Sequence, residues 1–81
     1  MLVRTLFFAS YRDALGTDAL DVDLPEGASV RELVRSIRAR GAPFDRLPPA
    51  PAVAVNRTVV RGDARLSNGD EIAFLPPVAG G

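Results

Sequence analysis

One well-marked helix among short apolar segments is the feature that most restricts the fold of this 81-residue chain. Ser29-Val-Arg-Glu32 has the spacing of a capping box, which begins a helix, and the helical pattern continues to Arg40 with Gly41 as its terminator. Its apolar residues recur at i, i+3, i+4 and i+7 and form one stripe: Val30, Leu33, Val34 and Ile37. Three arginines lie off this stripe and are expected on a solvated face. One such helix can cover only one face of a sheet.

Short strands are expected on both sides of this helix. Residues 2–8 are apolar on both faces, and residues 18–24 alternate apolar and polar side chains, so the two should pair as a hairpin. A proline-rich crossover over residues 42–51 follows the helix. Three further strands are expected at residues 52–55, 58–60 and 71–75. This order predicts an α+β fold, the β-grasp or ubiquitin-like arrangement, in which a mixed sheet of four to five strands grips one main helix.

Helix caps and turns are expected at the remaining connections between helices and strands. Ser10 is expected to cap a short helix over residues 11–15, which Gly16 ends. Asn56-Arg57 should form a tight turn between two strands. Asp70 and Glu71 could be read as a carboxylate pair, but neighbours on a strand point to opposite faces, so they are expected to cap the turn before the last strand.

The face of the sheet that the helix leaves open should carry apolar side chains. Both faces of the first strand are apolar, and the last strand places its apolar residues on alternate faces as well. The residues expected to contribute to the open side are Leu6, Phe8, Val59, Ala73 and Leu75. An exposed apolar patch of this kind indicates a docking surface for a partner protein, unless the proline-rich crossover lies over it.

The sequence after residue 75 is that of a strand stop followed by a bare tail. Pro76 and Pro77 cannot donate to a β-ladder, so pairing must end before them. The four residues that follow are Val78, Ala79, Gly80 and Gly81. We therefore expect a β-grasp domain over residues 1–75 and an extended tail over residues 76–81. Its two glycines have no side chains and could thread a narrow channel in another protein.

The amino-acid composition excludes most kinds of catalysis by side chains. All ten basic residues are arginine, and Lys, His and Cys are absent, so the usual bases, amines and thiols are missing and no metal site is expected. Equal numbers of acidic and basic residues give no footprint for nucleic acid or a membrane. We expect a cytoplasmic protein that is not a catalyst alone. Any reacting group should be the carboxylate of Gly81, which adenylation would activate and sulfur exchange would convert to a thiocarboxylate.

Four blocks of the sequence resemble the small, sulfur-carrier subunit of molybdopterin synthase. They are Leu6-Phe-Phe-Ala9 with Arg12, Gly16-Thr-Asp-Ala19, Ala54-Val-Asn56 with Thr58, and Gly69-Asp-Glu-Ile-Ala-Phe-Leu-Pro-Pro-Val-Ala-Gly-Gly81. The last block is the most specific, and the similarity extends over essentially the whole chain. The long helix and the proline-rich crossover are the least similar regions.

The resemblance implies that several partner proteins act on this chain in sequence. An adenylyltransferase related to ubiquitin-activating enzymes would use ATP to activate Gly81, and a sulfur donor protein would supply the sulfur. The tail, residues 76–81, would insert into a large catalytic subunit and donate sulfur to cyclic pyranopterin monophosphate, in a heterotetramer of two small and two large subunits. The resemblance also places the partner interface at Phe8, Val59 and Leu75. It implies no cofactor bound by this chain itself.

Three alternatives share the same sequence features. The first is the sulfur carrier of thiamine thiazole synthesis, which has the same fold and ending but fits the Phe-Leu-Pro-Pro-Val segment poorly. The second is a ubiquitin-like modifier that is joined to lysines of other proteins through Gly81. The third is a plain interaction module with no chemistry in its tail.

Overall fold

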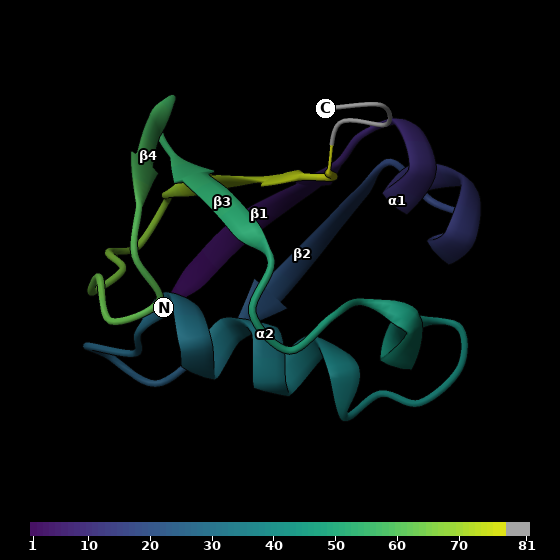
Figure 1. Ribbon diagram of the computed structural model, residues 1–81. Helices are drawn as coiled ribbons and strands as arrows, with labels where there is room; N and C mark the ends of the chain where they lie inside the picture. The colour runs from purple at the N-terminus through teal and green to yellow at the C-terminus, as the bar shows by residue number, and fades with distance from the viewer. Residues whose placement is uncertain (78–81) are drawn as a thin grey trace.

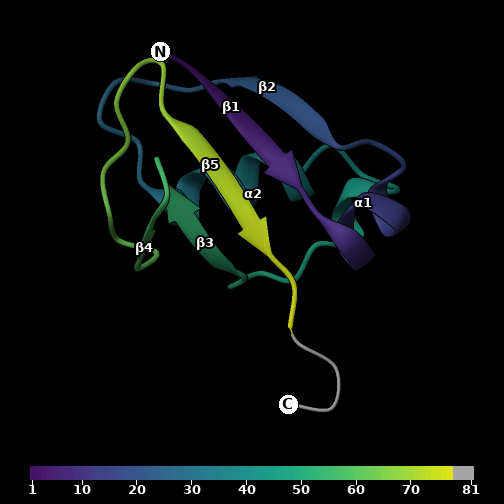
Figure 2. The same ribbon diagram turned by 90° about the horizontal axis from the view of Figure 1, so that it is seen from above.

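The computed structural model describes residues 1–77, in which five strands form one mixed sheet in the order β2-β1-β5-β3-β4 (Figures 1 and 2). The strands are β1 (Leu2–Phe7), β2 (Ala19–Asp23), β3 (Ala52–Val55), β4 (Thr58–Val60) and β5 (Glu71–Leu75). β1 and β5 are parallel neighbours at the centre, and the other neighbouring pairs are antiparallel. The predicted α+β, β-grasp architecture is confirmed, including the hairpin of the first two strands.

The main helix, α2 (Val30–Arg38), begins where its capping box predicts. The Ser29 hydroxyl oxygen accepts a hydrogen bond from the backbone N–H of Glu32 at 3.2 Å, and the same hydroxyl lies 3.2 Å from a Glu32 carboxylate oxygen. The helix ends at Arg38, two residues short of the predicted end, with Ala39 as its C-cap. Gly41 does adopt the left-handed conformation expected of a terminator, with φ of +81°.

The hydrophobic core lies between α2 and one face of the sheet (Figure 1). The four predicted stripe residues of α2 are all buried. They meet side chains that alternate along the central strands, where the rings of Phe7 and Phe74 lie 5.3 Å apart. Thr5 is the buried polar residue of β1, and its hydroxyl donates to the Leu20 carbonyl at 2.7 Å, so the core accommodates it without an unsatisfied group.

The short helix, α1 (Ala9–Leu15), starts earlier than predicted, and the assignment of Ser10 as its cap is wrong. Phe8 occupies the N-cap position with an extended backbone, and no side chain caps the helix there. The reason is that β1 runs almost directly into the helix through Ala9, whose φ is +47°, and this leaves no separate capping residue. Gly16 ends the helix in a left-handed conformation, as predicted.

The proline-rich crossover packs on the same side of the sheet as α2 (Figure 1). It contains a short 3-10 helix, η1 (Phe44–Arg46), which contacts both α1 and α2. Leu47 is buried in the core, and Phe44 is partly buried against it. The crossover therefore does not cover the other face of the sheet, and that face stays open.

Candidate docking face and chain exit

The central strand β5 carries the chain to the edge of the domain (Figure 2). It lies between β1 and β3 and ends at Leu75, directly before the two prolines, as the sequence predicts. Pro76 is partly buried and Pro77 is exposed. The predicted tail-insertion and reactive residues Val78, Ala79, Gly80 and Gly81 lie outside the described residues.

A row of apolar side chains crosses the open face of the sheet beside this exit. Leu6 of β1 pairs with Ala73 of β5, Ala73 pairs with Ala54 of β3, and Ala54 pairs with Val59 of β4. Directly paired residues project to the same face of a sheet, so these four side chains lie in one line. The strand register thus produces an apolar row that spans four strands.

The three residues predicted for the partner interface border this row. Val59 is the row's outer member and is 70% exposed, and Phe8 is 46% exposed just beyond the end of β1. Leu75 lies two residues after Ala73 on the same strand, so it projects to the same face, and it is partly buried. We call Leu6, Phe8, Ala54, Val59, Ala73 and Leu75 the docking face.

The opposite end of the open face carries charged side chains beside the exposed Leu2. Arg4 of β1 pairs in register with Asp21 of β2 and with Glu71 of β5. The Arg4 guanidinium donates to the Asp21 carboxylate at 3.2 Å, and both side chains are more than half exposed. The open face is thus divided along the strands, with its apolar half next to the chain exit and its charged half away from it.

Sequence reasoning missed two contributors to this region. Ala54 completes the apolar row, and only the register between strands could reveal it. Asn56 holds the start of β5 in place: its side-chain amide donates to Asp70 at 2.9 Å, and its side-chain carbonyl accepts from the Glu71 backbone at 3.0 Å. An asparagine before a hairpin reversal is only a turn signal in a sequence.

The turn-capping role predicted for Asp70 and Glu71 is found for Asp70 and is wrong for Glu71, which is the first residue of β5. A carboxylate oxygen of Asp70 accepts from the backbone N–H of Ser67 at 2.7 Å, which closes the turn. The Glu71 side chain is exposed on the open face and takes no part in this turn. The two carboxylates are thus not arranged as a catalytic acid and base.

The described part of the chain offers binding surface rather than reactive groups. Within residues 1–77, no three or more His, Cys, Asp or Glu side chains gather in a way that could hold a metal ion. No helix in that range has the length and apolar character needed to cross a membrane. Burial raises the pKa of Tyr11 above its ordinary value.

Comparison with protein families places the sequence in a known group. The model of the ThiS family matches residues 5–81, which is nearly the whole chain. The chain belongs to the ThiS family. Its relatives include the molybdopterin synthase sulfur carrier subunit of Escherichia coli, which is 39% identical over 82 residues, an alignment that covers 99% of this chain and 100% of that protein.

Solved structures of similar proteins share the fold. A putative molybdopterin converting factor subunit 1 from Pyrococcus furiosus superposes with a TM-score of 0.81 at 32% identity, and the match covers 96% of this chain and 99% of that one. A chain in the complex of subunits 1 and 2 of the molybdopterin-converting factor from Helicobacter pylori gives a TM-score of 0.71 at 26% identity, with complete coverage of both chains. A protein with this fold is therefore seen assembled with a second subunit.

Proposed function

We propose that this ThiS-family chain is the sulfur-carrier subunit of a molybdopterin synthase. The observation that carries the proposal is its 39% identity, over 100% of the relative's length, to a protein with that role. The apolar docking face beside the end of β5 supports it, because a carrier must be held by a partner while its end is presented. The Helicobacter pylori complex gives a precedent for such an assembly.

In this proposal the docking face binds the large catalytic subunit, with Phe8, Val59 and Leu75 as apolar contacts. Apolar side chains stabilise a complex in proportion to the surface they remove from water, and Val59 has the largest exposed fraction of the three to lose. Pro76 and Pro77 follow β5 directly and restrict the backbone, so they would direct residues 78–81 toward the catalytic subunit. The assembly would contain two small and two large subunits.

The chemistry takes place at the carboxylate of Gly81. The carboxylate attacks the α-phosphorus of ATP on an adenylyltransferase, and pyrophosphate leaves. Hydrosulfide released by a donor protein then displaces AMP, which carries away one carboxylate oxygen, and yields a thiocarboxylate. In the synthase this sulfur attacks cyclic pyranopterin monophosphate, and hydrolysis of the acyl–sulfur bond returns Gly81 to a carboxylate.

The composition of the chain fits a carrier that depends on its partners for catalysis. Without Cys, the chain has no side-chain thiol that could compete for the carried sulfur. Without Lys or His, proton transfers at the pterin would be made by residues of the large subunit. ATP would be bound by the adenylyltransferase and not by this chain. Because the reaction serves cofactor synthesis, we place it in the cytoplasm.

Intact-mass analysis tests this proposal. The chain is co-expressed with an adenylyltransferase that activates ThiS-family carriers and with a sulfur donor protein. We expect the mass of the chain to rise by about 16 Da as one oxygen is replaced by sulfur. A variant that lacks Gly81 serves as the control and should not gain this mass. An unchanged mass under conditions that convert the Escherichia coli relative would contradict the proposal, and isopeptide adducts on other proteins would indicate a modifier instead.

A further inference from the structure

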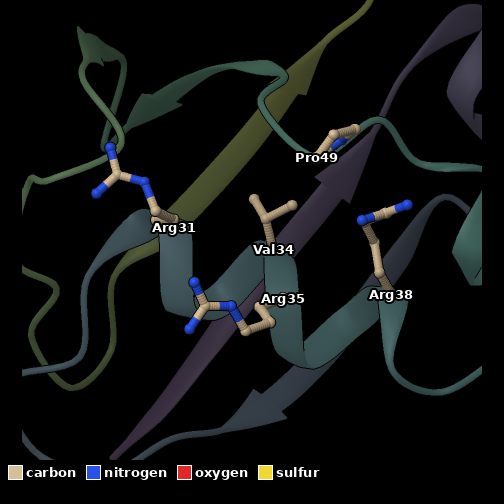
Figure 3. Close-up of a pocket in the computed structure, with 5 residues that line it drawn as sticks. All are labelled: Arg31, Val34, Arg35, Arg38 and Pro49. Atoms are coloured by element: carbon tan, nitrogen blue, oxygen red, sulfur yellow. The ribbon is translucent and has the colours of Figure 1, made fainter.

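The far side of α2 carries a row of three arginines around a pocket (Figure 3). Arg31, Arg35 and Arg38 follow the i, i+4, i+7 spacing, so they share one side of the helix. Together with Val34 and with Pro49 of the crossover they line a hollow of about 290 Å³. Figure 3 shows their side chains spread around Val34, with Pro49 on the opposite wall.

The positive charge of this pocket is not balanced within the part of the chain that the structure describes. None of the three arginines forms an ion pair among residues 1–77. Arg35 also borders a shallower hollow with Asp23 and Glu32, but Asp23 pairs with the N-terminal ammonium at 3.5 Å and Glu32 lies 3.8 Å from Arg65. The Nε of Arg38 is buried and has no hydrogen-bond partner. A buried donor without an acceptor is costly, so the described residues leave this guanidinium only partly satisfied.

Helix stability explains the arrangement only in part, because Arg35 and Arg38 lie in the last turn of α2, where the helix dipole favours a positive charge. Like charges at i, i+4 on a helix repel each other, as Arg31 and Arg35 do here. Arg31 also lies in the first turn of α2, where the helix dipole disfavours a positive charge. An anion bound between the guanidinium groups would relieve both effects.

A second, largely apolar hollow continues from the arginine pocket. It measures about 350 Å³ and shares Arg31, Val34 and Pro49 with the first. Its walls are extended by Val30, Pro51 and Val60 and also by a fourth arginine, Arg61. The two hollows form one groove between α2, the crossover and β4, with a cationic half and an apolar half. We call it the arginine groove.

We propose that the arginine groove binds a small organic phosphate. The phosphate group would lie among Arg31, Arg35 and Arg38, since the guanidinium fork matches phosphate oxygens in geometry and charge. The apolar or aromatic part would rest on Val34, Pro49 and Val60. Each hollow is at the small end of the range for small-molecule sites, which favours a compact ligand over a protein surface.

The proposed site is separate from the docking face and does not depend on the sulfur-carrier function. Neighbouring residues on a strand point to opposite faces. Val60 of β4 therefore borders the groove on the α2 side, while Val59 belongs to the docking face on the open side. A ligand in the groove and a partner on the docking face could be bound together.

Amide NMR titrations in phosphate-free buffer test the site with three probes: phenyl phosphate, inorganic phosphate and phenol. We expect phenyl phosphate to give saturable shifts at amides of residues 31–38, 50 and 52, and to bind about tenfold more tightly than inorganic phosphate, because both halves of the groove are used. Phenol alone should not saturate. Absence of saturable shifts with phenyl phosphate, or equal affinity of both anions as for an adventitious ion only, would overturn the proposal.

Two charge-matched variants show whether the groove or the overall charge is responsible. Replacing Arg31, Arg35 and Arg38 together by Gln should weaken phenyl phosphate binding at least about tenfold. Replacing Arg40, Arg46 and Arg57 by Gln removes the same charge outside the groove and should change binding less than about twofold. Equal loss in both variants would overturn the site, as would saturable binding of a polyglutamate peptide with none of phenyl phosphate. If the first variant does not fold, Arg38→Gln is compared with Arg40→Gln, which removes the same single charge outside the groove.

Discussion

At the scale of single residues, the turn between β3 and β4 is held in an unfavourable backbone conformation. Asn56 and Arg57 both have positive φ, +48° and +73°. Two positive φ angles are the signature of a two-residue hairpin turn for which Asn-Gly is the preferred sequence. Asn56 matches that preference and also binds Asp70, but Arg57 bears the steric cost of a side chain.

Arg57→Gly should therefore stabilise the protein. We expect the free energy of unfolding to rise by about 0.5–1 kcal/mol, since the relief of backbone strain exceeds the added entropy of the unfolded chain. Urea denaturation followed by circular dichroism measures this difference. Arg57→Ala removes the same charge and keeps the strain, so it should give little gain; equal stabilisation by both variants would show that charge and not backbone conformation is responsible.

The exposed residues of the docking face should tolerate substitution in the free protein and not in the complex. Val59→Arg is expected to change the free energy of unfolding by less than about 0.5 kcal/mol, because the side chain is 70% exposed. It should weaken binding to the large subunit at least about tenfold, because a charge would be buried without a partner. Isothermal titration calorimetry measures the affinity.

Thr58→Arg is the matched control for this prediction. Thr58 is also exposed on β4 and is the neighbour of Val59, so its side chain projects to the other face. We expect its affinity for the large subunit to stay within about twofold of the unmodified chain. A similar loss for both variants would mean that the edge of β4, and not the open face, contacts the partner.

For single residues, the sequence predicts which face of the sheet a side chain projects to better than it predicts which residues are its neighbours across the strands. Because successive side chains of a strand project to opposite faces, the positions of Phe8 and Leu75 in the expected strands were enough to predict that they lie on the open side. The contribution of Ala54 to the docking face could not be predicted from the sequence, because it depends on which strands are neighbours in the sheet. Ser10 was misassigned because a serine before a helical pattern does not reveal whether the preceding strand leaves room for a cap.

At the scale of elements, α2 is the part of the fold that local signals determine most fully. Its stripe, its cap and its start all follow from spacing within a few residues, and all are found in the structure. α1 is less well determined, since its seven residues hold few periodic positions and its start depends on the end of β1. The division of residues 1–75 and 76–81 into domain and tail stays a prediction.

The cap of α2 provides a test of this local control. Ser29→Ala removes the acceptor for the Glu32 N–H and should lower the free energy of unfolding by about 1 kcal/mol. Ser29→Asp restores an acceptor at the same place and should recover most of that loss. Thermal or urea unfolding of the three proteins gives the comparison, and an unchanged stability of Ser29→Ala would show that the hydrogen bond contributes nothing to the helix.

At the scale of the whole molecule, the β-grasp topology separates two surfaces and sets one of them beside the chain exit. A central parallel pair, β1 and β5, brings the end of β5 next to Phe8 and the docking face. Because α2 and the crossover lie on the other side, this face stays available to a partner while the arginine groove stays accessible behind it. The sequence order of elements predicted the fold class, whereas the choice of face covered by the crossover required the structure.

The central claim is that the folded body provides binding and that Gly81 provides the chemistry. A variant lacking only Gly81 separates these two roles when it is reconstituted with the large subunit, the adenylyltransferase, a sulfur donor and cyclic pyranopterin monophosphate. Molybdopterin formation is the decisive measurement, with binding to the large subunit recorded in the same preparation. We predict binding within about twofold of the unmodified chain and no product; product formation at the unmodified rate would contradict the claim.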